Sequence, residues 1–254
     1  MADNFKERFS QAVKETETVV YSYLPEETGH QKTIFEAMNY SVKAGGKRLR
    51  PLLMREVYRL FGGNGPEIEP FMAAMEMIHT SSLIHDDLPC MDNDEYRRGK
   101  LTTWKAYGYD MAVLAGDALM IYAFETASKA FSMGADPAKV GRAIGILAEK
   151  TGIYGMIGGQ TVDVELTGKA IPREKLDFIY RLKTGALLEA SMMIGAVLAG
   201  ATVEEIKEVE TMASEVGLAF QIQDDILDVT STQEELGKPV LSDEKNEKTT
   251  YVTL

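Results

Sequence analysis

The sequence predicts an all-α fold in a single domain that takes in residues 1–254. Three observations predict it. Apolar residues recur three and four positions apart along several stretches, which is the spacing of one helix face. No stretch alternates apolar and polar residues as a half-buried strand does, and there is no internal repeat or low-complexity linker. The one Asn-Gly pair, in Gly63-Asn64-Gly65, lies between helical stretches and not between strands. A length of 254 residues suits one large domain or two small ones.

The helical spacing marks six stretches of the chain. In order, they are residues 11–23, 31–44, 68–83, 111–131, 144–164 and 203–227. The third carries Phe71, Met72, Met75 and Ile78 on one face. The fourth is apolar on nearly all sides, so we expect it to form a buried helix. Prolines fall mostly between these stretches, where they do not interrupt a helix.

Composition excludes several classes of protein. The chain carries 27 basic and 39 acidic residues, a net charge of −12, which argues against an electrostatic nucleic-acid binder. The single cysteine, Cys90, permits no intrachain disulfide and suits a reducing, cytoplasmic setting. The first residues carry no apolar signal-peptide core, and the uncharged run 190–203 is shorter than the about 18–20 residues that span a bilayer. We therefore expect a soluble protein without an integral membrane segment.

Two acidic clusters follow apolar helical stretches. Carboxylates at a helix C-terminus oppose the helix dipole and repel one another unless a cation neutralises them. Hard divalent cations that prefer oxygen ligands, Mg²⁺ in particular, would do so. The alternative, a solvated helix end, is reasonable for one cluster and much less so for two. Asp86 and Asp92 lie six positions apart, off one face of a regular helix, so the helix must bulge or end there. The candidate metal ligands are Asp86, Asp87, Asp92, Asp224, Asp225 and Asp228.

Short basic motifs supply cations that would hold an anion beside such metals. Arginine forks and lysine ammonium groups both suit phosphate oxygens. Taken alone, each motif is more often a solvated surface run, but their arrangement around two acidic clusters favours a site. His79 lies two helical turns before Asp86 on the same face. The basic candidates are Lys47, Arg48 and Arg50 after a glycine pair, Arg97, Arg98 and Lys100 after the first acidic cluster, then Lys183 and Lys238.

These motifs together resemble those of the trans-isoprenyl diphosphate synthases, the family that includes the farnesyl and geranylgeranyl diphosphate synthases. The resemblance runs from residue 45 to residue 251. It implies a bundle of antiparallel helices around a central cavity, usually in a homodimer. Family members usually extend further at the C-terminus, so the chain resembles one that lacks its final helices. The matching motifs are Gly45-Gly46-Lys47-Arg48-Leu49-Arg50-Pro51, Asp86-Asp87-x₄-Asp92, Arg97-Arg98-Gly99-Lys100, Gly116-Asp117, Gly158-Gly159-Gln160-x-x-Asp163, Lys183-Thr184-Gly185, Phe220-Gln221-x-x-Asp224-Asp225-x-x-Asp228, Gly237-Lys238 and Ser242-Asp243-x₄-Lys248-Thr249.

The resemblance implies a short-chain prenyltransferase that condenses isopentenyl diphosphate with dimethylallyl, geranyl or farnesyl diphosphate. Mg²⁺, three ions once the allylic diphosphate is bound, would link that diphosphate to the aspartates of both clusters. The residues that would hold the allylic diphosphate or face its carbocation, and so form the catalytic set, are Arg97, Lys183, Thr184, Gln221 and Lys238. Those that would bind isopentenyl diphosphate without metal are Lys47, Arg50, His79 and Arg98.

The helix before Asp86 would form the wall of the pocket into which the product grows. Ser81 lies five residues upstream, about 7.5 Å along the helix, where similar farnesyl synthases commonly carry an aromatic floor. Ser81 and Ser82 are both small, so a C20 product is favoured over a C15 product. The alternative is that another helix fills the space above Ser81 and restores the C15 limit. The floor of an open pocket would fall to deeper residues: Met77, Ile78 or Met120.

Two other classes of protein remain open. A class I terpene cyclase also uses an Asp-rich helix motif with Mg²⁺, but it would lack the second Asp-Asp-x-x-Asp motif and a pocket for a second diphosphate. A non-catalytic subunit that redirects an active partner would typically lose one of the two Asp-rich motifs. The chain keeps both motifs, which favours catalysis.

Overall fold

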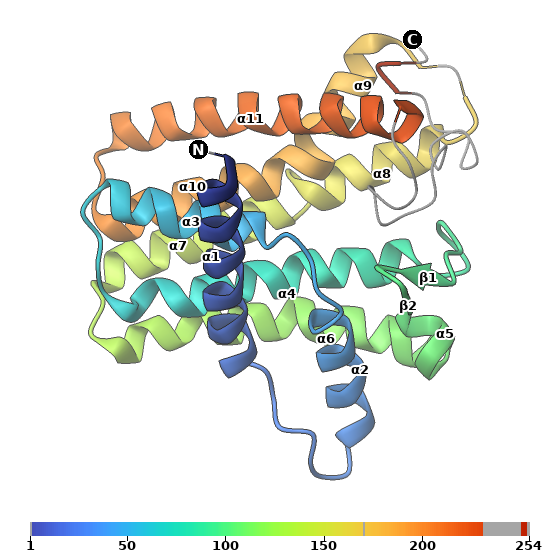
Figure 1. Ribbon diagram of the computed structural model, residues 1–254, viewed down its shortest axis with the longest axis horizontal. Coiled ribbons are helices and arrows are strands. Elements are labelled where there is room, and N and C mark those ends of the chain that lie inside the picture. The colour runs from blue at the N-terminus through green and yellow to red at the C-terminus, as the bar shows by residue number, and fades with distance from the viewer. Residues whose placement is uncertain (1, 170, 231–249, 253–254) are drawn as a thin grey trace.

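The computed structural model describes residues 2–169, 171–230 and 250–252, which are almost entirely helical (Figure 1). The all-α prediction is confirmed. The elements of the first half are α1 (Ala2–Ser22), α2 (Lys32–Val42), α3 (Leu49–Leu60), the 3₁₀ helix η1 (Pro66–Ile68), α4 (Glu69–Asp86), β1 (Tyr96–Arg97), β2 (Lys100–Leu101), α5 (Thr103–Tyr107) and α6 (Tyr109–Ser128). Those of the second half are the 3₁₀ helix η2 (Lys129–Met133), α7 (Pro137–Thr151), α8 (Met156–Leu166), α9 (Arg173–Ile179), the π-helix η3 (Tyr180–Gly185), α10 (Ala186–Ala199) and α11 (Val203–Thr230).

Two apolar helices, α4 and α10, form the centre of the bundle. Both are buried along most of their length. α4 packs chiefly against α6, whereas α10 packs against α3, α7 and α11. The contact between α10 and α3 is close, because a Cβ atom added at Gly195 would lie 2.3 Å from the backbone oxygen of Met54. The core therefore depends on glycine at this crossing as well as on large apolar side chains.

Residues that favour helix termini stand where two of the helices begin or end. α7 begins at Pro137, a favoured residue for the first helical turn, and the carboxylate of Asp136 accepts a hydrogen bond from the backbone N–H of Ala138. α10 ends at Ala199 and is followed by Gly200, whose φ of +95° lies in the left-handed region that glycine tolerates best. These caps fix where α7 and α10 begin and end.

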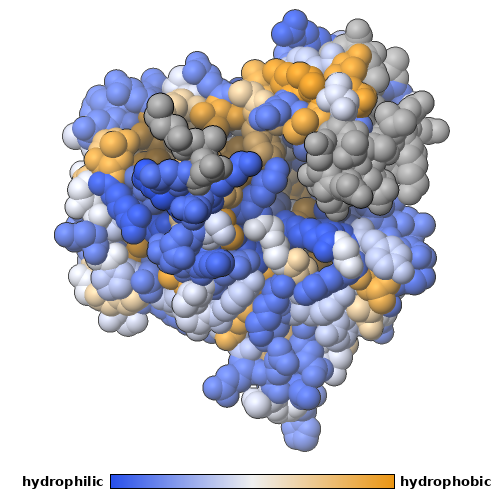
Figure 2. Space-filling view, viewed as in Figure 1, coloured by the Kyte–Doolittle hydropathy of each residue, from blue (hydrophilic) through white to orange (hydrophobic). Residues whose placement is uncertain are grey.

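The arrangement places the ends of three helices near one another. α4 and α11 run across the bundle and end on the same side, close to the β1–β2 hairpin and to α8 (Figure 1). On the face of the molecule that is viewed in Figure 1, hydrophilic side chains form a band across the middle, and hydrophobic side chains gather near α9 (Figure 2). Both predicted acidic clusters therefore lie at one end of the molecule.

Three details differ from the sequence predictions. The stretch 144–164 is not one helix: it divides into α7 and α8, with Gly152 and Gly155 between them. The helix α6 is not buried on all sides, since Leu114 and Ile121 are 55% and 70% exposed. A two-stranded antiparallel hairpin is also present, in which Arg97 pairs with Lys100. Its strands have only two residues each, too short to show an alternating pattern.

Among the described residues, two segments are long and apolar enough to cross a membrane by length and composition, namely Tyr109–Met133 and Arg173–Ala199. The most apolar windows of these segments are 39% and 78% buried inside the protein. Core helices of soluble proteins pass the same test, so these segments are weak evidence for a membrane span.

Candidate active site

The first acidic cluster lies where α4 ends. The helix stops at Asp86, as the six-residue spacing to Asp92 requires. The loop that follows turns back, and the backbone N–H of Asp92 donates to the backbone oxygen of Asp86 at 2.9 Å. Asn93, with a φ of +54°, helps the chain to reverse direction. Asp86 and Asp92 are thereby brought together although they are not on one helix face.

Asp87 faces the protein rather than the loop. The Nε and Nη2 atoms of Arg97 donate to its carboxylate at 2.6–2.9 Å, and the β1–β2 hairpin carries the arginine into place. The Asp87 side chain is almost completely buried. Burial raises its pKa to about 6, although the Arg97 ion pair opposes that shift. Asp87 therefore orients Arg97, one of the predicted anion-binding residues.

α8 contributes two polar side chains to the same end of the bundle. Gln160 donates from Nε2 to Asp86 at 2.8 Å. Its buried Oε1 has no hydrogen-bond partner among the described residues, so this atom could accept from a donor or coordinate a cation. Asp163 accepts from the ammonium group of Lys183 at 2.6 Å. Burial lowers the pKa of Lys183, but the charges of Asp86 and Asp163 outweigh it, so the pKa is raised and the lysine stays charged.

The π-helix η3 links this region to α11. The hydroxyl of Thr184, which follows Lys183, donates to Gln221 Oε1 at 2.8 Å. Gln221 in turn donates from Nε2 to Asp225 at 3.2 Å. Asp225 is buried and accepts two further hydrogen bonds, from the Tyr180 hydroxyl at 2.7 Å and the Tyr251 backbone N–H at 3.0 Å. Polar contacts therefore link α8 to η3 and η3 to α11, the helix that carries the second acidic cluster.

A separate group of basic side chains lies beside the first cluster. Arg50 Nη1 is 3.3 Å from His79 Nε2. Arg98 follows Arg97 in the hairpin, turns the other way, and donates to the backbone oxygen of Gly45. Burial lowers the pKa of His79 well below its usual value near 6.5, and the charges of Arg50 and Arg98 lower it further. His79 is therefore a neutral imidazole whose Nε2 accepts from Arg50, which leaves the proton on Nδ1.

The remaining predicted residues are placed as follows. Lys47 is exposed on the loop before α3, and Lys238 lies outside the described residues. Asp224 is half-buried and Asp228 buried in the last turns of α11. Ser81 is completely buried with Met77 and Ile78, whereas Ser82 and Met120 are half-buried.

Sequence reasoning missed several residues that complete the site. Gln160 stood in a recognised motif as a helix-packing or supporting position and not as a ligand, Asp163 stood in the same motif without a role, and no role was assigned to Tyr180 or Tyr251. The glycine before Gln160 carries the signal for the first two. A Cβ at Gly159 would lie 2.4 Å from the backbone nitrogen of Lys183, so glycine there lets α8 approach η3 closely. Nothing in the sequence pattern marks the two tyrosines.

The site fits a metal that is only partly held by protein. Among the described residues, no three acidic, histidine or cysteine side chains lie close enough to hold a metal ion by themselves. Mg²⁺ characteristically binds one or two carboxylates and takes its other ligands from water and phosphate oxygens. The carboxylates of Asp86 and Asp92 and the unpartnered Oε1 of Gln160 supply oxygen donors of that kind.

Comparison with known proteins decides the family. A sequence model described as "Polyprenyl synthetase" matches residues 31–254. The chain belongs to the polyprenyl synthetase family. It is 44% identical to the farnesyl diphosphate synthase of Geobacillus stearothermophilus, over 100% of this chain and 86% of that protein. It is 49% identical to the chloroplastic geranylgeranyl pyrophosphate synthase of Capsicum annuum, over 87% of this chain but only 60% of that protein.

Solved structures of polyprenyl synthetase relatives have the same fold as this chain. A geranyltransferase from Helicobacter pylori, complexed with magnesium and isoprenyl diphosphate, superposes with a TM-score of 0.83 at 33% identity. The match covers 98% of this chain and 82% of that one. Every predicted site residue lies within the segment that the family model matches, whereas α1 lies outside it.

Proposed function

We propose that this chain is a short-chain prenyltransferase. It condenses isopentenyl diphosphate with an allylic diphosphate, namely dimethylallyl, geranyl or farnesyl diphosphate, and releases diphosphate together with geranylgeranyl or farnesyl diphosphate. The single observation that carries the proposal is the pair of adjoining sites at one end of the bundle. One joins two acidic helix ends through Lys183, Thr184 and Gln221, and the other is the basic pocket of Arg50, His79 and Arg98. Relatives named as farnesyl and geranylgeranyl synthases support the same reaction.

The first site suits an allylic diphosphate that binds together with three Mg²⁺ ions. The residues that would hold the metal are Asp86 and Asp92 on one side and Asp224 and Asp228 on the other. Bound there, Mg²⁺ supplies Lewis-acid stabilisation of the charge on a leaving diphosphate. Arg97, Lys183 and Lys238 bind the oxygens of the same diphosphate. Asp87 and Asp225, which the sequence also predicts as metal ligands, hold the surrounding donors in position, because their carboxylates accept hydrogen bonds from Arg97 and from Tyr180.

The reaction then needs no protein nucleophile. The allylic C–O bond breaks, and its electron pair leaves with the diphosphate. The oxygens of Thr184 and Gln221 lie beside the resulting carbocation and stabilise it. The double bond of isopentenyl diphosphate, which Lys47, Arg50, His79 and Arg98 hold in place, attacks the carbocation and forms the new C–C bond. Loss of a proton to the released diphosphate then restores the double bond.

The direct test is diphosphate release from isopentenyl and dimethylallyl diphosphates, with Mg²⁺ and with EDTA. We expect turnover only with Mg²⁺, and a loss of about 10²–10³-fold in Asp86→Asn. Asp110→Asn, at an exposed position at the start of α6, should match the unaltered enzyme. Diphosphate release from an allylic substrate without isopentenyl diphosphate would indicate a terpene cyclase. The absence of any turnover with Mg²⁺ would indicate a non-catalytic subunit.

We extend the proposal to product length, with C20 favoured over C15. The complete burial of Ser81 fits the C15 alternative, in which neighbouring elements already fill the space around it. The small side chains of Ser81 and Ser82 favour the open wall, which a larger side chain at position 81 would close. Ser81→Tyr should therefore shift the main product to farnesyl diphosphate, whereas Ser82→Ala should leave the product unchanged. If Ser81→Tyr and the unaltered enzyme give the same chromatographic profile, Ser81 does not set the length.

We also propose that the enzyme is a cytoplasmic homodimer. Leu114 and Ile121 lie two turns apart on α6, and both are more than half exposed. Neighbouring apolar side chains on one exposed helix face favour a protein partner, here a second copy of the chain. Sedimentation equilibrium should give twice the 28.1 kDa of one chain, and Leu114→Glu with Ile121→Glu should give the monomer.

A further inference from the structure

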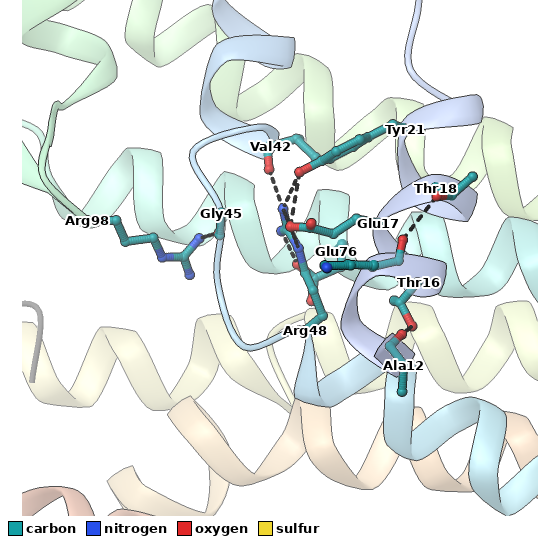
Figure 3. Close-up of polar contacts among 11 residues, drawn as sticks. Ala12, Thr16, Glu17, Thr18, Tyr21, Val42, Gly45, Arg48, Glu76 and Arg98 are labelled. Atoms are coloured by element: carbon teal, nitrogen blue, oxygen red, sulfur yellow. Dashed lines mark hydrogen bonds and ion pairs between the residues drawn. The ribbon is translucent and has the colours of Figure 1, made fainter. Parts of the chain in front are cut away.

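Arg48 belongs to the basic loop before α3 but does not face the basic pocket. It has a left-handed backbone conformation with a φ of +49°, and its side chain is completely buried. Figure 3 shows the guanidinium group turned inward between α1 and α4. Nη1 donates to Glu76 at 2.8 Å, and Nη2 donates to the backbone oxygen of Val42 at 2.8 Å. The Arg48 side chain therefore ties the loop to the protein interior instead of binding a ligand.

The helix α1 supplies the other half of this anchor. Glu17 Oε1 accepts from Nε and Nη2 of Arg48 at 3.2 Å and 3.1 Å. The hydroxyl of Tyr21 accepts from Nη2 at 3.1 Å and donates to Glu17 at 3.1 Å. A buried guanidinium is tolerated only where its donors are satisfied in this way. We refer to Glu17, Tyr21, Arg48 and Glu76 as the Arg48 clasp.

The clasp joins the parts of the basic pocket. Gly45, which accepts from Arg98, lies three residues before Arg48, and Arg50 lies two residues after it. Glu76 is three residues before His79 on α4, so the two side chains lie one turn apart on the same helix face. The clasp therefore holds the two chain segments that carry Arg50 and His79 at a fixed separation.

Arg98 restricts the conformation of the loop before α3 on the side that faces away from Arg48. Gly46 has a φ of +142°, and a Cβ atom there would lie 2.9 Å from Cζ of Arg98. The loop is thus held between Arg98 outside and Arg48 inside. Glu76 also acts on the pocket electrostatically: burial lowers the pKa of Arg50, and the charge of Glu76 opposes that shift.

We propose that α1, through the Arg48 clasp, positions the pocket for isopentenyl diphosphate. Glu17, Tyr21 and Arg48 are positioning residues, because they reach the ligand only through Arg50, His79 and Arg98. The inference rests on the proposed function, which assigns that ligand to the pocket. It adds that α1, which lies outside the segment matched by the family model, takes part in substrate binding.

The test compares two glutamates on α1. Glu17 is in the clasp, whereas Glu15 pairs with Arg55 of α3 at 3.4 Å and is half-exposed. Glu17→Ala should raise the KM for isopentenyl diphosphate about ten-fold, because displaced binding groups lose affinity steeply. The KM for dimethylallyl diphosphate and kcat should stay within about two-fold. Glu15→Ala should leave all three parameters unchanged, and Glu17→Gln, which keeps the acceptor oxygen, should restore most of the loss.

A second measurement separates positioning from folding. Calorimetry with isopentenyl diphosphate in EDTA reports the metal-independent pocket alone, and thermal denaturation reports stability. A weaker affinity in Glu17→Ala than in Glu15→Ala, measured well below the melting temperature of both variants, supports the clasp whether or not Glu17→Ala also melts at a lower temperature. If Glu17→Ala lowers the melting temperature but leaves the affinity for isopentenyl diphosphate unaltered, the clasp only stabilises the fold, and the inference is overturned. If the unaltered protein neither binds nor turns over isopentenyl diphosphate, the proposed function itself fails.

Discussion

Replacing His79 by glutamine would test the electrostatics of the basic pocket. His79 Nε2 lies 3.3 Å from Arg50 Nη1. Two positive charges at that distance repel by about 5 kcal/mol at an effective dielectric constant near 20. Burial and the charges of Arg50 and Arg98 accordingly lower the pKa of His79 well below 6.5. In the folded protein the imidazole therefore remains neutral under mildly acidic conditions.

The consequence for stability follows from proton linkage. In the unfolded chain, His79 takes up a proton near pH 6.5, whereas in the folded protein it does not. Below pH 6.5 the unfolded state binds more protons, so the free energy of unfolding falls as pH falls. For one group of this kind, the loss between pH 7.5 and pH 5.5 is about 1.4 kcal/mol.

Urea denaturation at pH 7.5 and pH 5.5 measures this quantity. His79→Gln keeps an acceptor for Arg50 but cannot titrate, so its stability should fall by about 1.4 kcal/mol less than that of the unaltered protein. His30→Gln, at an exposed position, controls for the loss of a histidine. Parallel pH profiles in the unaltered protein and His79→Gln would refute the reasoning, since they would mean that His79 titrates alike in both states.

Three further predictions concern contacts elsewhere in the chain. Asp163→Asn removes the ion pair to Lys183 and should lower kcat/KM for the allylic substrate by about ten- to a hundred-fold; unaltered kinetics would contradict this role. Gly195→Ala would place a Cβ 2.3 Å from the Met54 backbone oxygen, and should lower the free energy of unfolding by about 1–3 kcal/mol or more in urea. A change below about 0.5 kcal/mol would mean that α3 and α10 separate easily. Burial and a hydrogen bond to a carboxylate raise the pKa of Tyr58 to about 12, so this group lowers the free energy of unfolding between pH 10 and pH 12, and Tyr58→Phe should lose less stability over that range than the unaltered protein.

The helices with clear periodicity were predictable, and the breaks between them were not. α4 and α11 were expected from the spacing of their apolar residues, and both are confirmed. The boundary between α7 and α8 was missed because the apolar pattern continues through it. What ends α7 is the backbone conformation at Gly152 and the close approach of Gly155 to the backbone oxygen of Lys150, where a Cβ would lie 2.0 Å away. A periodicity argument does not detect contacts of that kind.

For the candidate site, sequence reasoning proposed the residues but did not predict how they pair with one another. The spacing of Asp86 and Asp92 correctly required the helix to end between them. The pairing of Asp87 with Arg97 depends on a hairpin whose strands are too short to leave a sequence signal. Arg48 was grouped with the ligand-binding cations because its neighbours in the chain are of that kind. Its left-handed backbone instead sends the side chain into the core, and only the structure reveals that direction.

In both Asp-Asp pairs, the first and the second aspartate have different surroundings. Successive residues on a helix point about 100° apart, so two adjacent aspartates near a helix end cannot face the same surroundings. Asp86 and Asp224, the first of each pair, are half-buried. Asp87 and Asp225, the second, are buried and accept hydrogen bonds from Arg97 in one case and from Tyr180 and Gln221 in the other. We therefore expect one carboxylate of each pair to face the proposed metal site and the other to hold the surrounding donors. Removing the second should disturb the geometry of its protein donors before it disturbs any metal, which is why Asp87→Asn and Asp86→Asn are not equivalent substitutions.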